Sequence, residues 1–257
     1  MKTKVFYALV GLLCLFFTEK ASAFQSNETD TLEKNDSYKP VNLNLTIKNM
    51  HLWRGYRVTS GAMSAVDLNY QSKNQHFKAG IWGGAGFDGE YREFDYYVGF
   101  KYDRWALDVW DINNFSDYPN AKIFDYSRAN TSHFIDVTLS YQLSKIRPVN
   151  LSWSTIVTGR DNYINDNNEL KSAFSNFVNL EYSLIYKGDD KLSVFAGYAF
   201  SFLNKANFYG SKPNFVSIGL NYTKNLKVFN HVVPVGAKAM WNPEQGYGGL
   251  QFSIQPF

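Results

Sequence analysis

Apolar and polar side chains alternate along much of this chain, and residues 91–102, YREFDYYVGFKY, show the pattern clearly. One set of alternate positions is aromatic or aliphatic: Phe94, Tyr96, Val98 and Phe100. The other set is charged or small: Glu93, Asp95, Gly99 and Lys101. A period of two residues places the two sets on opposite faces of a β-strand.

Twelve segments alternate in this way, so the pattern predicts an all-β protein. Their approximate bounds are 41–53, 63–71, 76–84, 92–102, 105–112, 132–142, 149–159, 173–187, 191–202, 214–223, 231–241 and 248–257. The connections are of three kinds: short (72–75, 103–104, 188–190), long (113–131, 160–172, 203–213) and intermediate (144–148, 224–230). Short turns that alternate with longer loops are typical of antiparallel up-and-down outer-membrane β-barrels.

A soluble β-sandwich or a lipocalin-like barrel would alternate too, and the composition of the polar face separates the two cases. A soluble barrel would turn that face outward and fill it with Lys and Glu, whereas here Gly, Ser, Asn, Thr and Ala predominate. Aromatic residues lie near segment ends, as in membrane-interface girdles: Tyr70, Tyr91, Tyr102, Trp105, Tyr141, Tyr186, Tyr222 and Trp241. We therefore predict a transmembrane β-barrel of about 12 strands, with its aromatic face in lipid and its charged face in the lumen.

The first residues predict export. Residues 1–4 are basic, residues 5–17 form an apolar run, and Ala21-Ser-Ala23 is a small-x-small cleavage site, so residues 1–23 read as a secretory signal peptide. The polar segment 24–40 is then a flexible periplasmic lead-in, and 41–257 is the barrel. This organisation predicts the bacterial outer membrane as the location, with outer-membrane lipid and the barrel-assembly machinery as partners.

Charge and cysteine content narrow the function classes. The net charge of +3 falls to about +1 when the signal peptide is removed, so no basic bias toward nucleic acid remains. The one cysteine, Cys14, lies in the signal peptide, so the mature chain does without disulfides. Neither metal-ligand spacing nor a phosphate-binding loop is present in the sequence, and we expect no metal and no cofactor.

Four stretches in order resemble a known family: NMHLWRGY (49–56), AGIWGGAGF (79–87), YREFDYYVGF (91–100) and LDVWDINNFSDYP (107–119). They are similar to the TorF-type porins, whose chains share a strand ending in Arg-Gly, a Gly-Trp strand, a Glu-x-Asp strand and an aromatic-Pro loop. The resemblance covers roughly the first half of the mature chain. It implies an outer-membrane β-barrel with a porin-like function and supplies no catalytic residues.

Arg54 is the first candidate for a functional side chain, because the apolar phase of the first segment changes near Asn49. A bulge at this point would turn Arg54 into the lumen. There it could reach Glu93 and Asp95 and form a constriction with separated charges that selects small polar solutes. The alternative is a salt-bridge cluster that plugs the barrel or stiffens its wall.

Further charged residues fall on the lumen phase of their segments and are candidates for lining a pore: Asp67, Lys78, Lys101, Asp108, Asp136 and Glu181. Their mixed signs predict no strong ion selectivity. The longest loop, 113–131, carries Phe115, Tyr118, Phe124 and Tyr126, which predicts packing either in the barrel mouth or over the outer rim.

The function predicted from these features is a porin-like channel or transporter for small solutes. A filled barrel with a structural or surface-interaction role is one alternative. The other is a lipid-modifying enzyme with Ser and His on the outer wall. Ser132 and His133 are neighbours and point to opposite faces, so they cannot pair with each other, whereas pairing across strands stays open. We expect no enzyme.

Overall fold

A computed structural model describes residues 38–118, 120–144 and 148–256. The predicted signal peptide and most of the lead-in lie outside the described residues, as does Phe257. Within the described ranges every regular element is a β-strand, which confirms the all-β prediction. None of these residues forms a helix long and apolar enough to cross a membrane.

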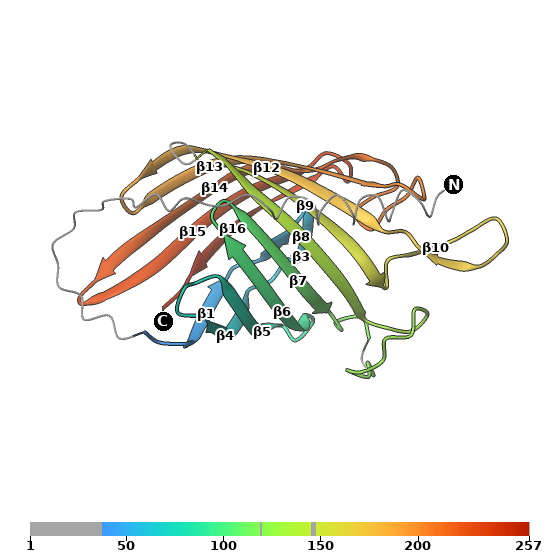
Figure 1. The fold of residues 1–257 in the computed structure, drawn as a ribbon, viewed down its shortest axis with the longest axis horizontal. Helices are drawn as coiled ribbons and strands as arrows, with labels where there is room; N and C mark the ends of the chain where they lie inside the picture. Colours follow the sequence, from blue (N-terminus) through green and yellow to red (C-terminus); the bar gives the residue numbers. More distant parts are fainter. Residues whose placement is uncertain (1–37, 119, 145–147, 257) are drawn as a thin grey trace. The chain divides into compact units, whose positions relative to one another are not determined.

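Twelve of the strands form one closed barrel, in which strands that follow one another along the chain lie side by side (Figure 1). They are β1 (Val41–Lys48), β4 (Met63–Gln71), β5 (Phe77–Gly86), β6 (Arg92–Tyr102), β7 (Trp105–Asn113), β8 (His133–Ser144), β9 (Val149–Gly159), β12 (Ser175–Lys187), β13 (Asp190–Ser201), β14 (Asn214–Val228), β15 (His231–Asn242) and β16 (Tyr247–Ile254). All neighbours pair antiparallel, and β1 pairs with β16 to close the ring. The predicted twelve-stranded antiparallel barrel is therefore confirmed.

Two small hairpins are inserted between barrel strands. One consists of β2 (His51–Trp53) and β3 (Tyr56–Thr59), and the other of β10 (Asn162–Ile164) and β11 (Leu170–Ser172). The prediction of one strand over 41–53 is therefore wrong. The Asn49 backbone amide still donates to the Phe252 carbonyl of β16 at 3.2 Å, while its side chain donates to the Leu250 carbonyl and accepts from the Phe252 amide. The chain leaves the wall after this residue, where side-chain bonds supplement the ladder.

The two ends of the barrel differ in the length of their connections. One end has the short connections 72–76, 103–104, 188–189 and 229–230, and we call it the turn end; β8 also ends and β9 begins there. The other, which we call the loop end, has the connections 49–62, 87–91, 114–132, 160–174, 202–213 and 243–246. The predicted intermediate connection at 224–230 is shorter than expected, because β14 pairs with β15 as far as Val228 and His231.

The exposed and buried faces of β6 follow the predicted phase. Val98 and Phe100 are about half exposed on the outer surface (46% and 49%), whereas Asp95 and Tyr97 are buried inside (3% and 5%). Tyr91 departs from the predicted girdle, because it is buried against Met63 and Ala65. Asp95 and Tyr97 are alternate residues of β6 and lie on the same face. The face that carries the charged residues is therefore the interior face.

A bulge in β12 also changes a predicted face. The pairing of β12 with β13 skips one residue between Ser183 and Ile185, so Ile185 lies opposite Leu192 and Tyr186 opposite Lys191. Since one inserted residue reverses the side-chain phase, Tyr186 no longer shares the outer phase of Leu180. Alternation alone could not reveal this shift.

Candidate functional site

The connection between β1 and β4, residues 49–62, folds into the barrel, and we call it the lumen hairpin. At its tip, Arg54 (φ 44°) and Gly55 (φ 92°) both have positive φ, as the two central residues of a type I′ turn require. A Cβ atom on Gly55 would lie 2.3 Å from the Val216 carbonyl oxygen of β14. Only glycine therefore permits this approach of the tip to the β14 wall.

Hydrogen bonds fix the lumen hairpin to one side of the barrel. The Gly55 carbonyl accepts from Asn242 Nδ2 and from the Tyr247 hydroxyl, both at 3.0 Å. The Leu52 amide donates to Gln251 Oε1 at 2.9 Å. These contacts attach the lumen hairpin to β16 and to the end of β15.

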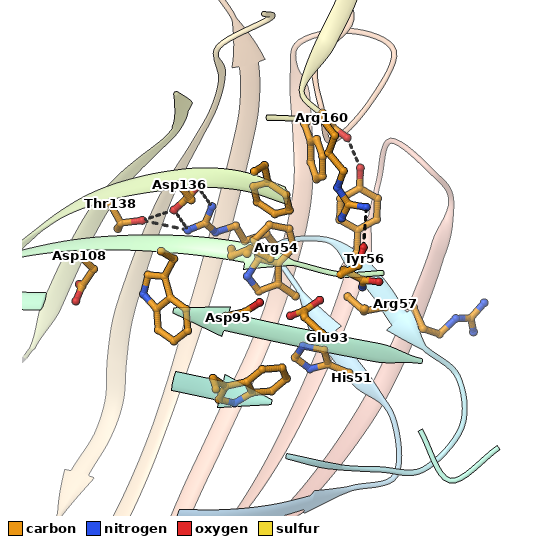
Figure 2. Close-up of a pocket in the computed structure, with 18 of the residues that line it drawn as sticks. His51, Arg54, Tyr56, Arg57, Glu93, Asp95, Asp108, Asp136, Thr138 and Arg160 are labelled. Carbon is orange, nitrogen blue, oxygen red and sulfur yellow. Dashed lines mark hydrogen bonds and ion pairs between the residues drawn. The ribbon is translucent and has the colours of Figure 1, made fainter. Parts of the chain in front are cut away.

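Arg54 attaches the same tip to the opposite wall. Its Nη1 and Nη2 atoms donate to the two carboxylate oxygens of Asp136 on β8, at 2.6 and 2.9 Å (Figure 2). Nη1 also donates to the Tyr209 hydroxyl at 3.0 Å, and Nη2 to Thr138 Oγ1 at 3.1 Å. The Asp136 side chain is 1% exposed and that of Arg54 17%, so this is a bidentate ion pair whose carboxylate is buried.

The hypothesis that Arg54 reaches Glu93 and Asp95 is wrong. A register shift is present near the predicted bulge, between His51 and Leu52, but it lies within the hairpin of β2 and β3 and not in a wall strand. The chain leaves the wall entirely, and the I′ turn directs the guanidinium toward β8 rather than toward β6. The predicted alternative, a salt-bridge cluster inside the barrel, matches the observed Arg54–Asp136 pair better.

Aromatic side chains pack around the tip and fill part of the loop end. Trp53 lies about 6 Å, centroid to centroid, from Phe134 and Tyr209. Phe208 and Tyr209 come from the connection between β13 and β14, and the Tyr56 hydroxyl donates to the Phe208 carbonyl. Tyr209 was not among the predicted site residues; the sequence feature that marks it is an aromatic pair in a mostly polar loop.

A cavity of about 760 Å³ remains between the lumen hairpin and the walls of the barrel (Figure 2). It brings together five of the predicted lumen residues: Arg54, Glu93, Asp95, Asp108 and Asp136. The lining also includes side chains that were not predicted: the basic ones are Lys48, His51, Arg57 and Arg160, and the aromatic ones are Trp53, Tyr56, Trp82, Trp110, Phe134 and Phe208.

The other predicted lumen residues lie elsewhere in the barrel. Asp67 accepts a hydrogen bond of 2.6 Å from the Tyr97 hydroxyl and forms an ion pair of 3.5 Å with Lys78. Glu181 pairs with Lys191 at 3.5 Å. Lys101 is exposed at the turn end. Their role in lining a pore stays a prediction.

The long loop after β7 packs over the outer rim. The Tyr126 hydroxyl donates to Asp111 Oδ2 at 2.6 Å, and the Tyr126 ring lies 4.6 Å from the ring of His133. Asp111 lies opposite Tyr96 in the ladder and therefore shares its outward phase. Of the two predicted arrangements of this loop, rim packing is the one observed at Tyr126.

His133 and Ser132 have separate partners. His133 Nδ1 lies 2.8 Å from Asp111 Oδ1, and its Nε2 has no hydrogen-bond partner among the described residues. The Ser132 hydroxyl donates to Asn113 Oδ1 at 2.6 Å. The expectation that these neighbours do not pair with each other is confirmed.

Comparison with family models gives no match, and comparison with curated proteins gives none. Among solved structures the chain is similar to an outer membrane channel from Pseudomonas putida F1. The two share 11% sequence identity with a TM-score of 0.42, over 87% of this chain and 98% of that one. The resemblance to TorF-type porins therefore stays a prediction from the sequence motifs.

Proposed function

We propose that this protein is an outer-membrane channel for small polar solutes whose lumen is narrowed by the lumen hairpin. The observation that carries this proposal is a closed barrel with an apolar outer face and a charged cavity inside. A bilayer favours that arrangement, because each strand turns alternate side chains to lipid and to a wet lumen. The loop end would face the cell exterior and the turn end the periplasm.

The distribution of charge supports polar solutes rather than one class of ion. Glu93, Asp95 and Asp108 line the cavity from β6 and β7, whereas Lys48 lines it from β1 and Arg160 from the residue after β9. A lumen with both signs of charge excludes neither anions nor cations strongly. Small neutral or zwitterionic polar solutes would therefore meet the lowest barrier.

The lumen hairpin also favours a second candidate, a filled barrel that acts as a structural or surface-interaction protein. Its tip is attached to both β8 and β16 and packs among buried aromatic side chains. Twelve strands lie between the roughly eight that side chains can fill and the roughly sixteen that leave an open pore. Solute flux distinguishes the two candidates.

Liposome swelling provides this test. Liposomes that contain the folded protein should swell faster in isotonic glycine than in isotonic sucrose, because the cavity beside the lumen hairpin leaves limited room. Liposomes with heat-unfolded protein are the control. Swelling no faster than in the control with every solute would reject the channel and support the filled barrel.

A further inference from the structure

Charged side chains of both signs line the cavity, and most of them form no ion pair with one another. Its lining has four Lys and Arg residues (Lys48, Arg54, Arg57, Arg160) and four Asp and Glu residues (Glu93, Asp95, Asp108, Asp136). In the part of the chain that the structure describes, the ion pair between members of this set is Arg54–Asp136. Three acidic side chains and two basic ones, Lys48 and Arg160, therefore line the cavity without an ion pair to one another, whereas the Arg57 guanidinium lies over the Tyr247 ring.

The acidic side of the cavity is formed mainly by β6. Glu93 and Asp95 are two residues apart, so they point to the same side of the strand (Figure 2). Asp95 is 3% exposed, and its Oδ1 accepts the Asn113 amide at 2.9 Å. Two adjacent carboxylates in a largely buried site favour a ligand that brings a positive charge and N–H donors.

The basic side is formed by Arg160, which follows β9, whereas Lys48 lies at the end of β1 on the opposite wall of the ring. Lys48 Nζ is held 3.3 Å from His51 Nδ1, and Arg160 Nη1 donates to the Asn114 carbonyl at 3.4 Å. Arg160 Nε is buried and has no hydrogen-bond partner within the described ranges. The Arg160 guanidinium can therefore still donate to a ligand carboxylate.

Aromatic side chains form most of the remaining wall. Trp82 stacks beside His51 with a centroid distance of 6.2 Å, and Trp110 stacks on Tyr97 at 4.2 Å. Phe134 and Phe208 lie under the Arg160 guanidinium. The cavity of about 760 Å³ is of the size that small-molecule sites in proteins have, and apolar walls with a few placed charges are typical of them.

We propose that this cavity binds a free aromatic α-amino acid, with its ammonium group toward Glu93 and Asp95 and its carboxylate toward Arg160. A simple cation would leave the positive charge of the basic side without a partner. A simple anion would leave the negative charge of the acidic side without one. The aromatic walls would take the ring by offset or edge contacts. This inference rests on the proposed function, since it names the solute class of the same lumen.

L-phenylalanine is the probe for a binding test on the full folded protein in detergent, measured by equilibrium dialysis. Two analogues each lack one charge: phenethylamine has no carboxylate, and N-acetyl-L-phenylalanine has no ammonium. L-phenylalanine should bind at one saturable site, and each analogue should bind about tenfold more weakly or worse, because a charged partner is lost. Absence of saturable binding, or equal binding of either analogue, would overturn the proposal.

Variants then assign the charges. Glu93→Gln should weaken L-phenylalanine and phenethylamine about tenfold and leave N-acetyl-L-phenylalanine unchanged. Glu169→Gln is the matched control, since Glu169 is exposed in the loop between β10 and β11 and lies outside the cavity lining. If Glu93→Gln folds and binds all three compounds like the unaltered protein, the ammonium subsite is wrong.

Binding and flux can fail separately. Dialysis in detergent requires no transport, so protein that swells liposomes and binds no L-phenylalanine would reject the amino-acid site and keep the channel. Protein that binds L-phenylalanine and supports no swelling would reject the channel and keep the site. The three-compound comparison on the unaltered protein decides the proposal even if Glu93→Gln does not fold.

Discussion

Leu139→Arg is expected to block insertion of the barrel into membranes, whereas Ser140→Arg, at the next residue of β8, is expected to be tolerated. Leu139 lies between Leu107 and Trp153 on the outer face, near the middle of the strand. An arginine that faces lipid near the bilayer midplane costs about 2–4 kcal/mol. That is a large part of the stability of a typical folded domain.

Ser140 is the matched control because its ladder neighbours are the small residues Ala106 and Ser152 on the inner face. An arginine there has room and would meet a wet lumen. Assembly is measured as the fraction of protein that migrates as the compact, heat-modifiable form after incubation with lipid vesicles. Equal assembly of the two variants would mean that the outer face does not contact lipid.

Arg54→Met is expected to destabilise the folded barrel by about 3–5 kcal/mol, because it leaves Asp136 buried without its counter-ion. The loss comes from the uncompensated carboxylate rather than from missing contacts, since methionine retains most of the side-chain length. The free energy of unfolding is measured by denaturant titration in detergent micelles. The double variant Arg54→Met/Asp136→Leu, which removes both charges, should recover most of the loss.

Lys171→Met is the comparison for this experiment. It removes a cation from an exposed ion pair with Glu169, which solvent screens strongly, so the stability should change little. If Arg54→Met were as mild as Lys171→Met, the pair would not be buried as the structure shows it. If the double variant were no better than Arg54→Met, an unpaired charge would not be the cause.

The barrel wall could be predicted from the sequence because its physics is local. In β13 the outward residues are apolar, such as Val194 and Tyr198, and most inward residues are small, such as Ser193 and Ala199, which are fully buried; the large inward residue is Phe195. In each strand, alternate side chains face lipid and the lumen, so the period of two can be read from one strand without knowing its neighbours. The bulge after Ser183 could not be predicted from the sequence, because one inserted residue leaves the composition of both faces almost unchanged.

The interior of the loop end could not be predicted in the same way. Arg54 and Asp136 are 82 positions apart, and the lumen hairpin meets Tyr209 a further 73 positions along the chain. Such contacts depend on which strands face each other across the closed ring, and alternation says nothing about that. The Arg-Gly pair at 54–55 was visible, but it marks a tight turn and not the direction in which the turn points.

Single-channel conductance in planar bilayers tests the central claim most directly, namely that the barrel is a membrane channel narrowed by the lumen hairpin. Lys48 and Met63 are ladder partners, so residues 50–61 can be replaced by three glycines that join β1 to β4 with a short turn. We predict small conductance steps for the unaltered protein and clearly larger steps for the shortened variant, with heat-modifiable migration retained in both. Equal steps would contradict the narrowing by the hairpin, and no steps from either folded protein would contradict the channel itself.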